Sequence, residues 1–371
     1  MRIAVDATPA AVQNAGVGRY TRELLAALVG LPGDDQYILA SAAADGENQQ
    51  LLRALPPGQF RDLRRLPLNP RLTTAAWQRL RLPLNVESLI GDFEVFHGPD
   101  FVVPPSRRPR VVTIHDLSFL LTPQFGDPRL VRYLTAVVPR ALDAATIVVS
   151  VSAAVAAEVA NAYSTARDKL IAIPNGVRFP QNSPKRNTDS RPSILTVGTV
   201  EPRKNHSTLI DALPIVRATH PDAILTIAGR VGWQSDEIAA QIRAAEASGV
   251  VHFVESPNDA DLDALYASAS VAVFPSYYEG FGLPVLEAMA RGVPVVSSNI
   301  ASLRETGGAA ACYADPTDPE SVAYAIVRLL DDRALRERHV TLGIAQAAQF
   351  SWHETARRTR RAYSLAKEGK R

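Results

Sequence analysis

Short apolar runs rich in β-branched residues alternate with longer stretches of helical composition along nearly the whole chain of 371 residues. This alternation predicts α/β architecture, with parallel sheets whose strands are joined by crossover helices. Strands are expected at Ile3–Val5, Tyr37–Leu39, Val95–His97, Val111–Ile114, Ile147–Ser150, Leu170–Ile173, Ile194–Val197, Ala223–Ala228, Val251–Val254, Val271–Phe274 and Val293–Ser297. Ligands of such doubly wound sheets bind beside the carboxyl ends of the strands, so the loops that follow strands are the first places to search for chemistry.

A polar, proline-bearing stretch divides the chain near its middle. Residues 181–192 contain little that could be buried and have the composition of a linker. We therefore expect one doubly wound domain over residues 1–180 and a second over residues 193–350. The segment 351–371 has no strand after it, and we expect it to form a terminal helix that packs back on the first domain.

Composition and the ends of the chain limit the class of protein. The single cysteine, Cys312, excludes an intrachain disulfide and a zinc site built from several cysteines. No apolar run approaches the roughly 18 residues that cross a bilayer, and the first residues read as a strand rather than as a signal peptide. The chain is therefore expected to be a cytoplasmic enzyme. Its pI of about 8.7 and the lack of a known module argue against a nucleic-acid partner.

One stretch of the first half is strongly basic. Its cations are Arg61, Arg64, Arg65, Arg71, Arg79 and Arg81, against the single carboxylate of Asp62. Leucines and Trp77 interleave with the arginines, a combination that suits an anionic membrane surface. Peripheral contact with the inner face of the plasma membrane is one interpretation, and a solvated helix face is the other.

Two glycines follow the first strand. Gly16 and Gly18 precede a helix expected over Arg19–Val29, and the backbone N–H groups at a helix start attract phosphate. A nicotinamide-dinucleotide site is a rival interpretation, but Thr21 replaces the third glycine of that fingerprint and no acidic residue ends the second strand. An ordinary turn before a helix explains the two glycines equally well.

Two adjacent cations, Arg203 and Lys204, follow the first strand of the second domain. At a junction between strand and helix they suit a diphosphate, because their charge can neutralise a leaving group as its bond to a sugar breaks. A solvated turn with two surface cations is the alternative.

The segment from Pro275 to Glu287 is the most informative part of the chain. Gly280 and Gly282 allow a tight backbone at the start of a helix, where amide groups can bind an anion or hydroxyls. Glu279 and Glu287 are eight residues apart, about two helical turns, so both are expected to face the same side. Two carboxylates there suit a ligand rich in hydroxyls. The alternative is one acid that favours the helix dipole and one solvated glutamate.

Two further residues end strands of the first domain. His115 follows the strand Val111–Ile114 and could bond a substrate hydroxyl or carbonyl, although a structural histidine is equally compatible with this position. Asn175 follows the strand Leu170–Ile173, where a plain turn is the alternative.

Together these segments resemble the retaining glycosyltransferases of family four, whose GT-B fold consists of two doubly wound parallel-sheet domains facing a central cleft. The resemblance covers nearly the whole chain and rests on Gly16–Tyr20, Thr113–Asp116, Ile173–Val177, Gly198–Asn205, Ala228–Trp233 and Glu279–Glu287. The last of these matches the E-x7-E signature of the family and is the most specific.

The resemblance implies a role for each candidate residue. Arg203 and Lys204 would hold the diphosphate of a sugar-nucleotide donor, Glu279 would hold the transferred sugar, and His115 would lie beside the hydroxyls of that sugar. Donor contacts would also come from Gly16, Gly18, Asn175, Gly280, Phe281, Gly282, Leu283 and Glu287, the last of these on the ribose. No metal and no other cofactor is expected.

The same resemblance favours the mannosyltransferases of bacterial polysaccharide assembly. The donor would be GDP-mannose, the acceptor a glycan or lipid-linked oligosaccharide, and the configuration at the anomeric carbon would be retained. UDP-glucose and UDP-N-acetylglucosamine are alternative donors, because Glu255, Ser256 and Pro257 stand where the family often has a glycine–aromatic pair near the base. A phosphorylase or hydrolase of the same fold and a non-catalytic partner in glycan assembly are the remaining alternatives.

Overall fold

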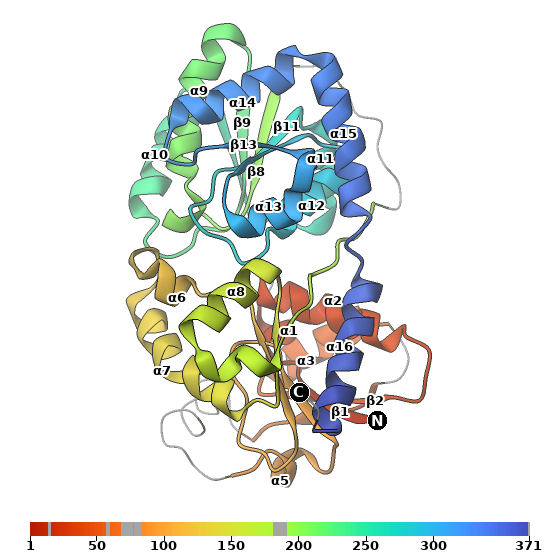
Figure 1. The fold of residues 1–371 in the computed structure, drawn as a ribbon. Coiled ribbons are helices and arrows are strands. Elements are labelled where there is room, and N and C mark those ends of the chain that lie inside the picture. The colour runs from red at the N-terminus through yellow and green to blue at the C-terminus, as the bar shows by residue number, and fades with distance from the viewer. Residues whose placement is uncertain (14–15, 57–59, 68–76, 78–83, 181–190, 370–371) are drawn as a thin grey trace. The chain divides into compact units, whose positions relative to one another are not determined.

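The computed structural model describes residues 1–13, 16–56, 60–67, 77, 84–180 and 191–369. The chain forms two compact units (Figure 1). The first unit consists of Met1–Leu117, Arg132–Gly176 and Ser351–Arg371, and the second of Ser118–Val131 and Val177–Phe350. Each unit is built on a parallel sheet with helices, so the two parallel α/β domains predicted from the sequence are confirmed.

The sheet of the first unit has seven parallel strands in the order β3-β2-β1-β4-β5-β6-β7. The strands are β1 (Arg2–Asp6), β2 (Gln36–Ser41), β3 (Phe60–Arg65), β4 (Val95–Gly98), β5 (Arg110–Ile114), β6 (Ile147–Ser150) and β7 (Leu170–Ala172). The strand order reverses between β1 and β4, and this is the topological switch point of the sheet.

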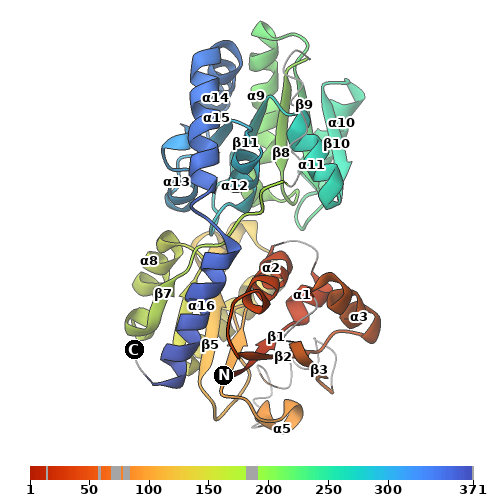
Figure 2. The same cartoon turned by 90° about the vertical axis from the view of Figure 1, so that its right-hand side faces the viewer.

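The helices of this unit include the last helix of the chain. They are α1 (Thr8–Val12), α2 (Val17–Val29), α3 (Asp45–Ala54), α5 (Glu87–Ile90), α7 (Pro128–Ala144, which begins in the second unit), α8 (Ala153–Ala162), η3 (Ser164–Lys169) and α16 (Trp352–Lys367). Helix α16 packs against α2 and against β4, β5 and β6, as Figure 2 shows from the side. A Cβ at Gly176 would collide with the backbone of Trp352, so a glycine is needed where the chain passes the start of α16.

The sheet of the second unit has six parallel strands in the order β10-β9-β8-β11-β12-β13. The strands are β8 (Ser193–Val197), β9 (Ile224–Gly229), β10 (Val251–Glu255), β11 (Val271–Phe274), β12 (Val295–Ser298) and β13 (Ala311–Ala314). Its helices are α6 (Ser118–Leu121), η2 (Pro123–Phe125), η4 (Pro202–Lys204), α9 (His206–Thr219), α10 (Asp236–Ala247), α11 (Asp259–Ser268), α12 (Leu283–Ala290), α13 (Ala301–Gly307), η5 (Gly308–Ala310), α14 (Pro319–Asp331) and α15 (Arg333–Ala347).

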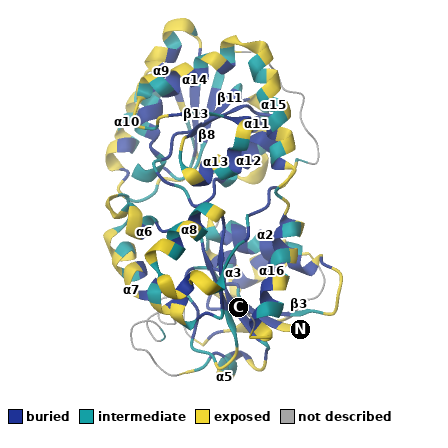
Figure 3. Ribbon diagram, viewed as in Figure 1, coloured by how far each residue is buried: buried dark blue, intermediate teal, exposed yellow. Residues whose placement is uncertain are grey.

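The strands carry the core of each unit, and the helices cover them. Figure 3 shows the strands of both sheets mostly buried, while the helices expose one side. In the second unit, apolar side chains of the central strands, such as Ile194, Leu225 and Val271, pack with Leu209 and Leu213 of α9. This burial of apolar surface is the main source of stability for such a domain. No helix within the described residues is long and apolar enough to cross a membrane.

Two strands were not predicted, and both lie at sheet edges. Strand β3 (Phe60–Arg65) begins the basic stretch, where the sequence suggested a membrane-facing segment or a helix. Charged side chains are common on edge strands because they discourage pairing with other chains. Strand β13 (Ala311–Ala314) is short and half alanine, so its composition gives little strand signal.

The segment Ser118–Val131 departs from the expected first domain of residues 1–180, because it groups with the second unit. The ring of Phe125 stacks on Tyr277, with ring centroids 5.2 Å apart and planes inclined by 12°. The indole N–H of Trp233 also donates a hydrogen bond of 2.8 Å to the carbonyl of Phe125. The expected linker, residues 181–192, lies outside the described residues apart from its last two.

Candidate functional site

A cluster of charged side chains lies at the topological switch point of the second sheet. The strand order reverses between β8 and β11, and the loops that follow these two strands leave the same edge of the sheet. Ligands of doubly wound sheets bind at this place. Arg203 and Lys204 come from the loop after β8, and Glu279 comes from the loop after β11.

The backbone ties the two loops together. Asn205 has a left-handed conformation (φ 57°), and its side-chain amide donates to the carbonyls of Pro275 (3.0 Å) and Pro316 (2.6 Å). In the opposite direction, the N–H of Tyr277 donates to the carbonyl of Arg203 at 2.9 Å. These bonds hold the two cations beside the loop that carries Glu279, although 75 residues separate Lys204 from Glu279 in the sequence.

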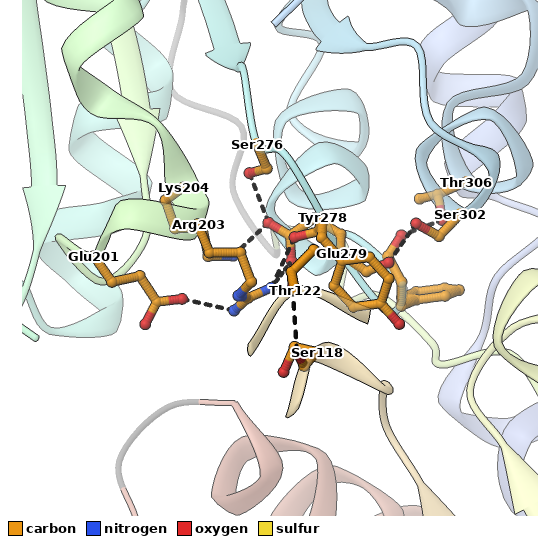
Figure 4. A network of polar contacts seen from close by, with 11 residues as sticks. Ser118, Thr122, Glu201, Arg203, Lys204, Ser276, Tyr278, Glu279, Ser302 and Thr306 are labelled. Carbon is orange, nitrogen blue, oxygen red and sulfur yellow. Dashed lines mark hydrogen bonds and ion pairs between the residues drawn. The ribbon is translucent and has the colours of Figure 1, made fainter. Parts of the chain in front are cut away.

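The side chains form one charge network (Figure 4). The ammonium of Lys204 lies 2.5 Å from Oε1 of Glu279, and the guanidinium of Arg203 lies 3.2 Å from Oε2. Arg203 also pairs with the buried carboxylate of Glu201 at 2.7 Å. Arg203, Lys204 and Glu279 are 13–17% exposed. Two cations and two carboxylates therefore share a largely buried site whose formal charges cancel.

The pKa of Glu279 shows which effect dominates in this network. Burial by itself would raise the pKa of this carboxyl group. The charges of Lys204 and Arg203, with hydrogen bonds from Lys204 and from the Ser276 hydroxyl, lower the pKa to about 2. Glu279 is therefore ionised throughout the neutral range and acts as the shared counter-ion of both cations.

The loop around Gly282 corrects the expected relation between the two glutamates. Helix α12 begins only at Leu283, after Gly282, which has a left-handed backbone (φ 100°). Glu279 precedes the helix, so the argument from two helical turns was wrong. Glu287 lies within α12, is 4% exposed, and accepts a hydrogen bond of 3.4 Å from the hydroxyl of Tyr266. Each glutamate thus has its own set of partners.

A small pocket adjoins this network. It is lined by residues of both loops, including Thr196, Lys204, Ser276, Glu279 and Gly282. His206, the first residue of α9, also lines it. Burial and the nearby charge of Lys204 lower the pKa of His206 to about 4, so its ring is neutral. Its Nδ1 has no hydrogen-bond partner among the described residues.

His115 belongs to the first unit, where its ring is held by three contacts. Its Nε2 lies 2.7 Å from the carbonyl of Pro99, which can only accept, so Nε2 carries the proton. The rings of Tyr20 and Phe101 pack against it edge-on, at centroid distances of 4.8 and 5.8 Å. Burial lowers the pKa of His115, although the hydrogen bond to the Pro99 carbonyl and the charge of Asp116 act in the opposite direction. The neutral ring therefore keeps Nδ1 as an acceptor.

A buried polar chain lies behind His115. The two ring nitrogens of His97 bond the hydroxyls of Tyr363 and Thr113, each at 2.8 Å, and Thr113 lies 3.4 Å from the hydroxyl of Tyr20. Burial lowers the pKa of His97 to about 3, so the ring stays neutral. This chain connects α16 to Tyr20 and so fixes the ring against which His115 packs.

The other candidates of the first unit have identifiable backbone roles. Gly16 is the N-cap of α2 with a left-handed backbone (φ 58°), and it is exposed. Gly18 is buried, and a Cβ there would collide with the carbonyl of Gln13, so close packing accounts for this glycine. Asn175 is buried after strand β7, and its Oδ1 has no hydrogen-bond partner among the described residues.

The basic stretch is described only in part. Arg71, Arg79 and Arg81 lie outside the described residues. The side chains of Arg64 and Arg65 are exposed, and they pair with Asp62 (2.5 Å) and Asp45 (3.0 Å). Leu66 is buried in a hydrophobic cluster of the first unit, and Trp77 is partly buried against that cluster.

Several residues of the site carried too little signal in the sequence. They are Glu201, Tyr266, Ser276, Ser302 and Thr306. Glu201 and Ser276 stand within the segments that drew attention to Arg203 and Glu279, so proximity could have suggested them. The other three reach the site from α11 and α13, and only the fold brings them there. The described residues include no group of three or more histidine, cysteine, aspartate or glutamate side chains placed to hold a metal ion.

Comparison with known protein families gives matches over both halves of the chain. The family model described as "Glycosyltransferase Family 4" matches residues 14–179, and the one described as "Glycosyl transferases group 1" matches residues 178–344. Together they include every candidate residue named above.

Among characterised relatives, the O-antigen chain mannosyltransferase B of Escherichia coli is 31% identical over 98% of this chain and 100% of its own length. A glycogen synthase of Mycobacterium tuberculosis is 34% identical over 60% of this chain and 55% of its own. Among solved structures, a sucrose-phosphate synthase from Thermosynechococcus elongatus has a TM-score of 0.73 at 21% identity, with 98% of each chain covered. HepE of Anabaena, solved in complex with UDP and glucose, has a TM-score of 0.74 at 17% identity and covers 98% of this chain and 99% of its own.

Proposed function

The chain belongs to glycosyltransferase family 4, and on that premise we propose that it transfers mannose from GDP-mannose to a glycan or lipid-linked saccharide, with retention of the anomeric configuration. It is a glycosyltransferase with the GT-B fold, as the sequence indicated. The choice of mannose is supported by the E. coli mannosyltransferase, whose similarity extends over the full length of both chains.

The observation that carries the proposal is the pair of cations on Glu279 at the switch point of the second sheet. Breaking the bond between the anomeric carbon and the diphosphate leaves the electron pair on a diphosphate oxygen. Arg203 and Lys204 would stabilise that charge, and their largely buried setting supports this role because electrostatic interactions are stronger away from water. The acceptor hydroxyl then forms the new bond to the anomeric carbon, and its proton goes to the departing diphosphate.

Separate residues would bind the rest of the donor. Glu287 is held by Tyr266 and has carboxylate oxygens that suit ribose hydroxyls. Glu279 and the backbone of Gly280–Leu283 would hold the transferred sugar, and Nδ1 of His115 could accept a hydrogen bond from one of its hydroxyls. Gly16, Gly18 and Asn175 remain proposed donor contacts.

For the acceptor we propose a saccharide presented at the inner face of an anionic membrane. Arg64 and Arg65 are exposed and support such a contact, although each already has a carboxylate partner. Their attraction to anionic lipid would amount to about 1 kcal/mol for each arginine near the surface.

The test is a thermal-shift panel of GDP, UDP, ADP, GDP-mannose, UDP-glucose, UDP-N-acetylglucosamine and NADH. A ligand that binds only the folded state stabilises it by about 2.7 kcal/mol at a concentration of 100 times its Kd. Selective stabilisation by GDP and GDP-mannose, lost in Lys204→Met, is the expected result. Selective stabilisation by uridine compounds would overturn the choice of mannose, and stabilisation by none of the panel would overturn the donor site.

A further inference from the structure

Two hydroxyl groups of α13 bind the loop that carries Glu279. The hydroxyl of Ser302 donates to the carbonyl of Glu279 at 2.5 Å, and the hydroxyl of Thr306 donates to the carbonyl of Phe281 at 2.6 Å. Both side chains are almost fully buried, at 4% and 0% exposure. Side chains from a separate helix therefore hold alternate carbonyls of this loop.

The geometry of the peptide bond turns these contacts into an orientation of N–H groups. In a planar trans peptide, the carbonyl of one residue and the N–H of the next point in opposite directions. Because the carbonyls of Glu279 and Phe281 point to α13, the N–H groups of Gly280 and Gly282 point away from it. Figure 4 shows Ser302 and Thr306 on one side of Glu279, and Arg203 and Lys204 on the other.

Without the two hydroxyls, this backbone would have other conformations available. Both N–H groups belong to glycines, which have the widest choice of backbone angles, and Gly282 adopts φ 100°. A rotated peptide would direct a carbonyl oxygen, instead of an N–H, to the side of the cations. Such an oxygen would repel a phosphate oxygen that the N–H would bind, since both atoms are hydrogen-bond acceptors.

We propose that Ser302 and Thr306 are positioning residues, which fix the peptide planes before Gly280 and Gly282 so that their N–H groups face the diphosphate oxygens beside the transferred sugar. The inference rests on the proposed function, because it requires the donor to bind beside this loop. Neither hydroxyl contacts the donor itself. Each acts through a carbonyl of the loop.

The experiment compares the affinities of GDP and GMP, measured by isothermal titration calorimetry. Ser302→Ala and Thr306→Val remove the hydroxyls, while Ser302→Thr and Thr306→Ser keep them. One net hydrogen bond corresponds to about a threefold to tenfold change in affinity. We expect each variant that lacks the hydroxyl to bind GDP more weakly by this factor and GMP more weakly by less than twofold. Each variant that keeps the hydroxyl should bind GDP as tightly as the parent.

Ser298→Ala is the matched control, because its buried hydroxyl also donates to a backbone carbonyl, that of Phe274, but outside the loop. It should lower Tm while leaving the ratio of GDP to GMP affinity unchanged. Equal weakening of GDP and GMP in Ser302→Ala and Thr306→Val, or an unchanged GDP affinity, would overturn the positioning role. If Lys204→Met also leaves the affinity for GDP unchanged, the proposed donor site is wrong. If Lys204→Met lowers the affinity for GDP but the hydroxyl variants do not, only the proposed role of the two hydroxyls is wrong.

Discussion

Replacing Glu279 by glutamine should change how the stability of the second unit depends on pH. The carboxyl group of Glu279 has a pKa of about 2 in the folded protein, against an ordinary value of 4.5. A shift of one unit corresponds to 1.36 kcal/mol, so the ionised form contributes about 3 kcal/mol to folding. Since the side chain is 13% exposed, solvent screening of its ion pairs is limited.

The sign follows from the direction of the shift. A group whose pKa is lowered by folding stabilises the protein above its unfolded pKa, and this contribution is lost as the pH falls through the folded value. The contribution of Glu279 is therefore complete above about pH 5 and should fall by about 2 kcal/mol between pH 5 and pH 3. Glu279→Gln cannot titrate, so its second unit should lose that much less stability over the same interval.

Urea unfolding at pH 5, 4 and 3 measures this difference. Trp233 is the tryptophan of the second unit, and replacing Trp77 and Trp352 by phenylalanine makes the emission specific to that unit. Glu320→Gln, which changes an exposed glutamate at the start of α14, is the matched control and should follow the parent protein. Parallel curves for the parent and Glu279→Gln would refute the claim that this carboxylate is strongly paired with the two cations.

Four further outcomes are expected. Lys204→Met should lower kcat/KM for transfer by roughly 100-fold, the scale of losing one charge that stabilises a leaving group, and it should also lower Tm because Glu279 loses its nearest cation; transfer within twofold of the parent would contradict this role. Glu279→Gln should lower transfer yet tighten GDP binding in calorimetry, because the carboxylate of Glu279 no longer competes with the diphosphate for the two cations; weaker GDP binding would contradict this competition. Incubation with EDTA should leave transfer unchanged, and a loss restored by Mn²⁺ would show a need for metal. Replacing Arg64 and Arg65 by glutamine should reduce sedimentation with phosphatidylserine vesicles, and unchanged sedimentation would favour a solvated surface.

The sequence predicted the architecture well, because the pattern that carries it is local. Alternation of buried strands with amphipathic helices repeats through both halves, and each predicted strand corresponds to one in the sheets. The two strands that were missed, β3 and β13, lie at sheet edges, where burial imposes less of a pattern.

The sequence predicted which residues of each loop belong to the site, but it did not predict how the loops come together. Arg203, Lys204 and Glu279 were each identified from their own segments, and the structure brings them into contact. What the sequence did not show is the adjacency of β8 and β11, which puts the two loops side by side. The error over Glu279 and Glu287 has a local cause, because Gly282 delays the start of α12 until Leu283.

Glycine is the residue type whose role the sequence leaves most open. Gly18 drew attention as a possible phosphate contact, yet the carbonyl of Gln13 leaves no space for a Cβ there. Gly229 likewise lies against the backbone of Gly198. A sequence shows that a backbone must come close to something, but only the fold shows whether that partner is a ligand or the chain itself.

The charges of the site explain why the pair of cations proposed to bind the diphosphate is accompanied by two carboxylates. A buried cation without a partner costs several kcal/mol, so Arg203 and Lys204 need counter-charge even when no donor is bound. Glu201 is buried and pairs with Arg203, whereas Glu279 bonds both cations from the loop that is proposed to hold the sugar. A donor diphosphate would therefore replace Glu279 on the cations and leave its carboxylate able to accept hydrogen bonds from sugar hydroxyls. The same residue would then neutralise the empty site and bind the sugar in the occupied one, which accounts for a glutamate, rather than a neutral residue, at this position.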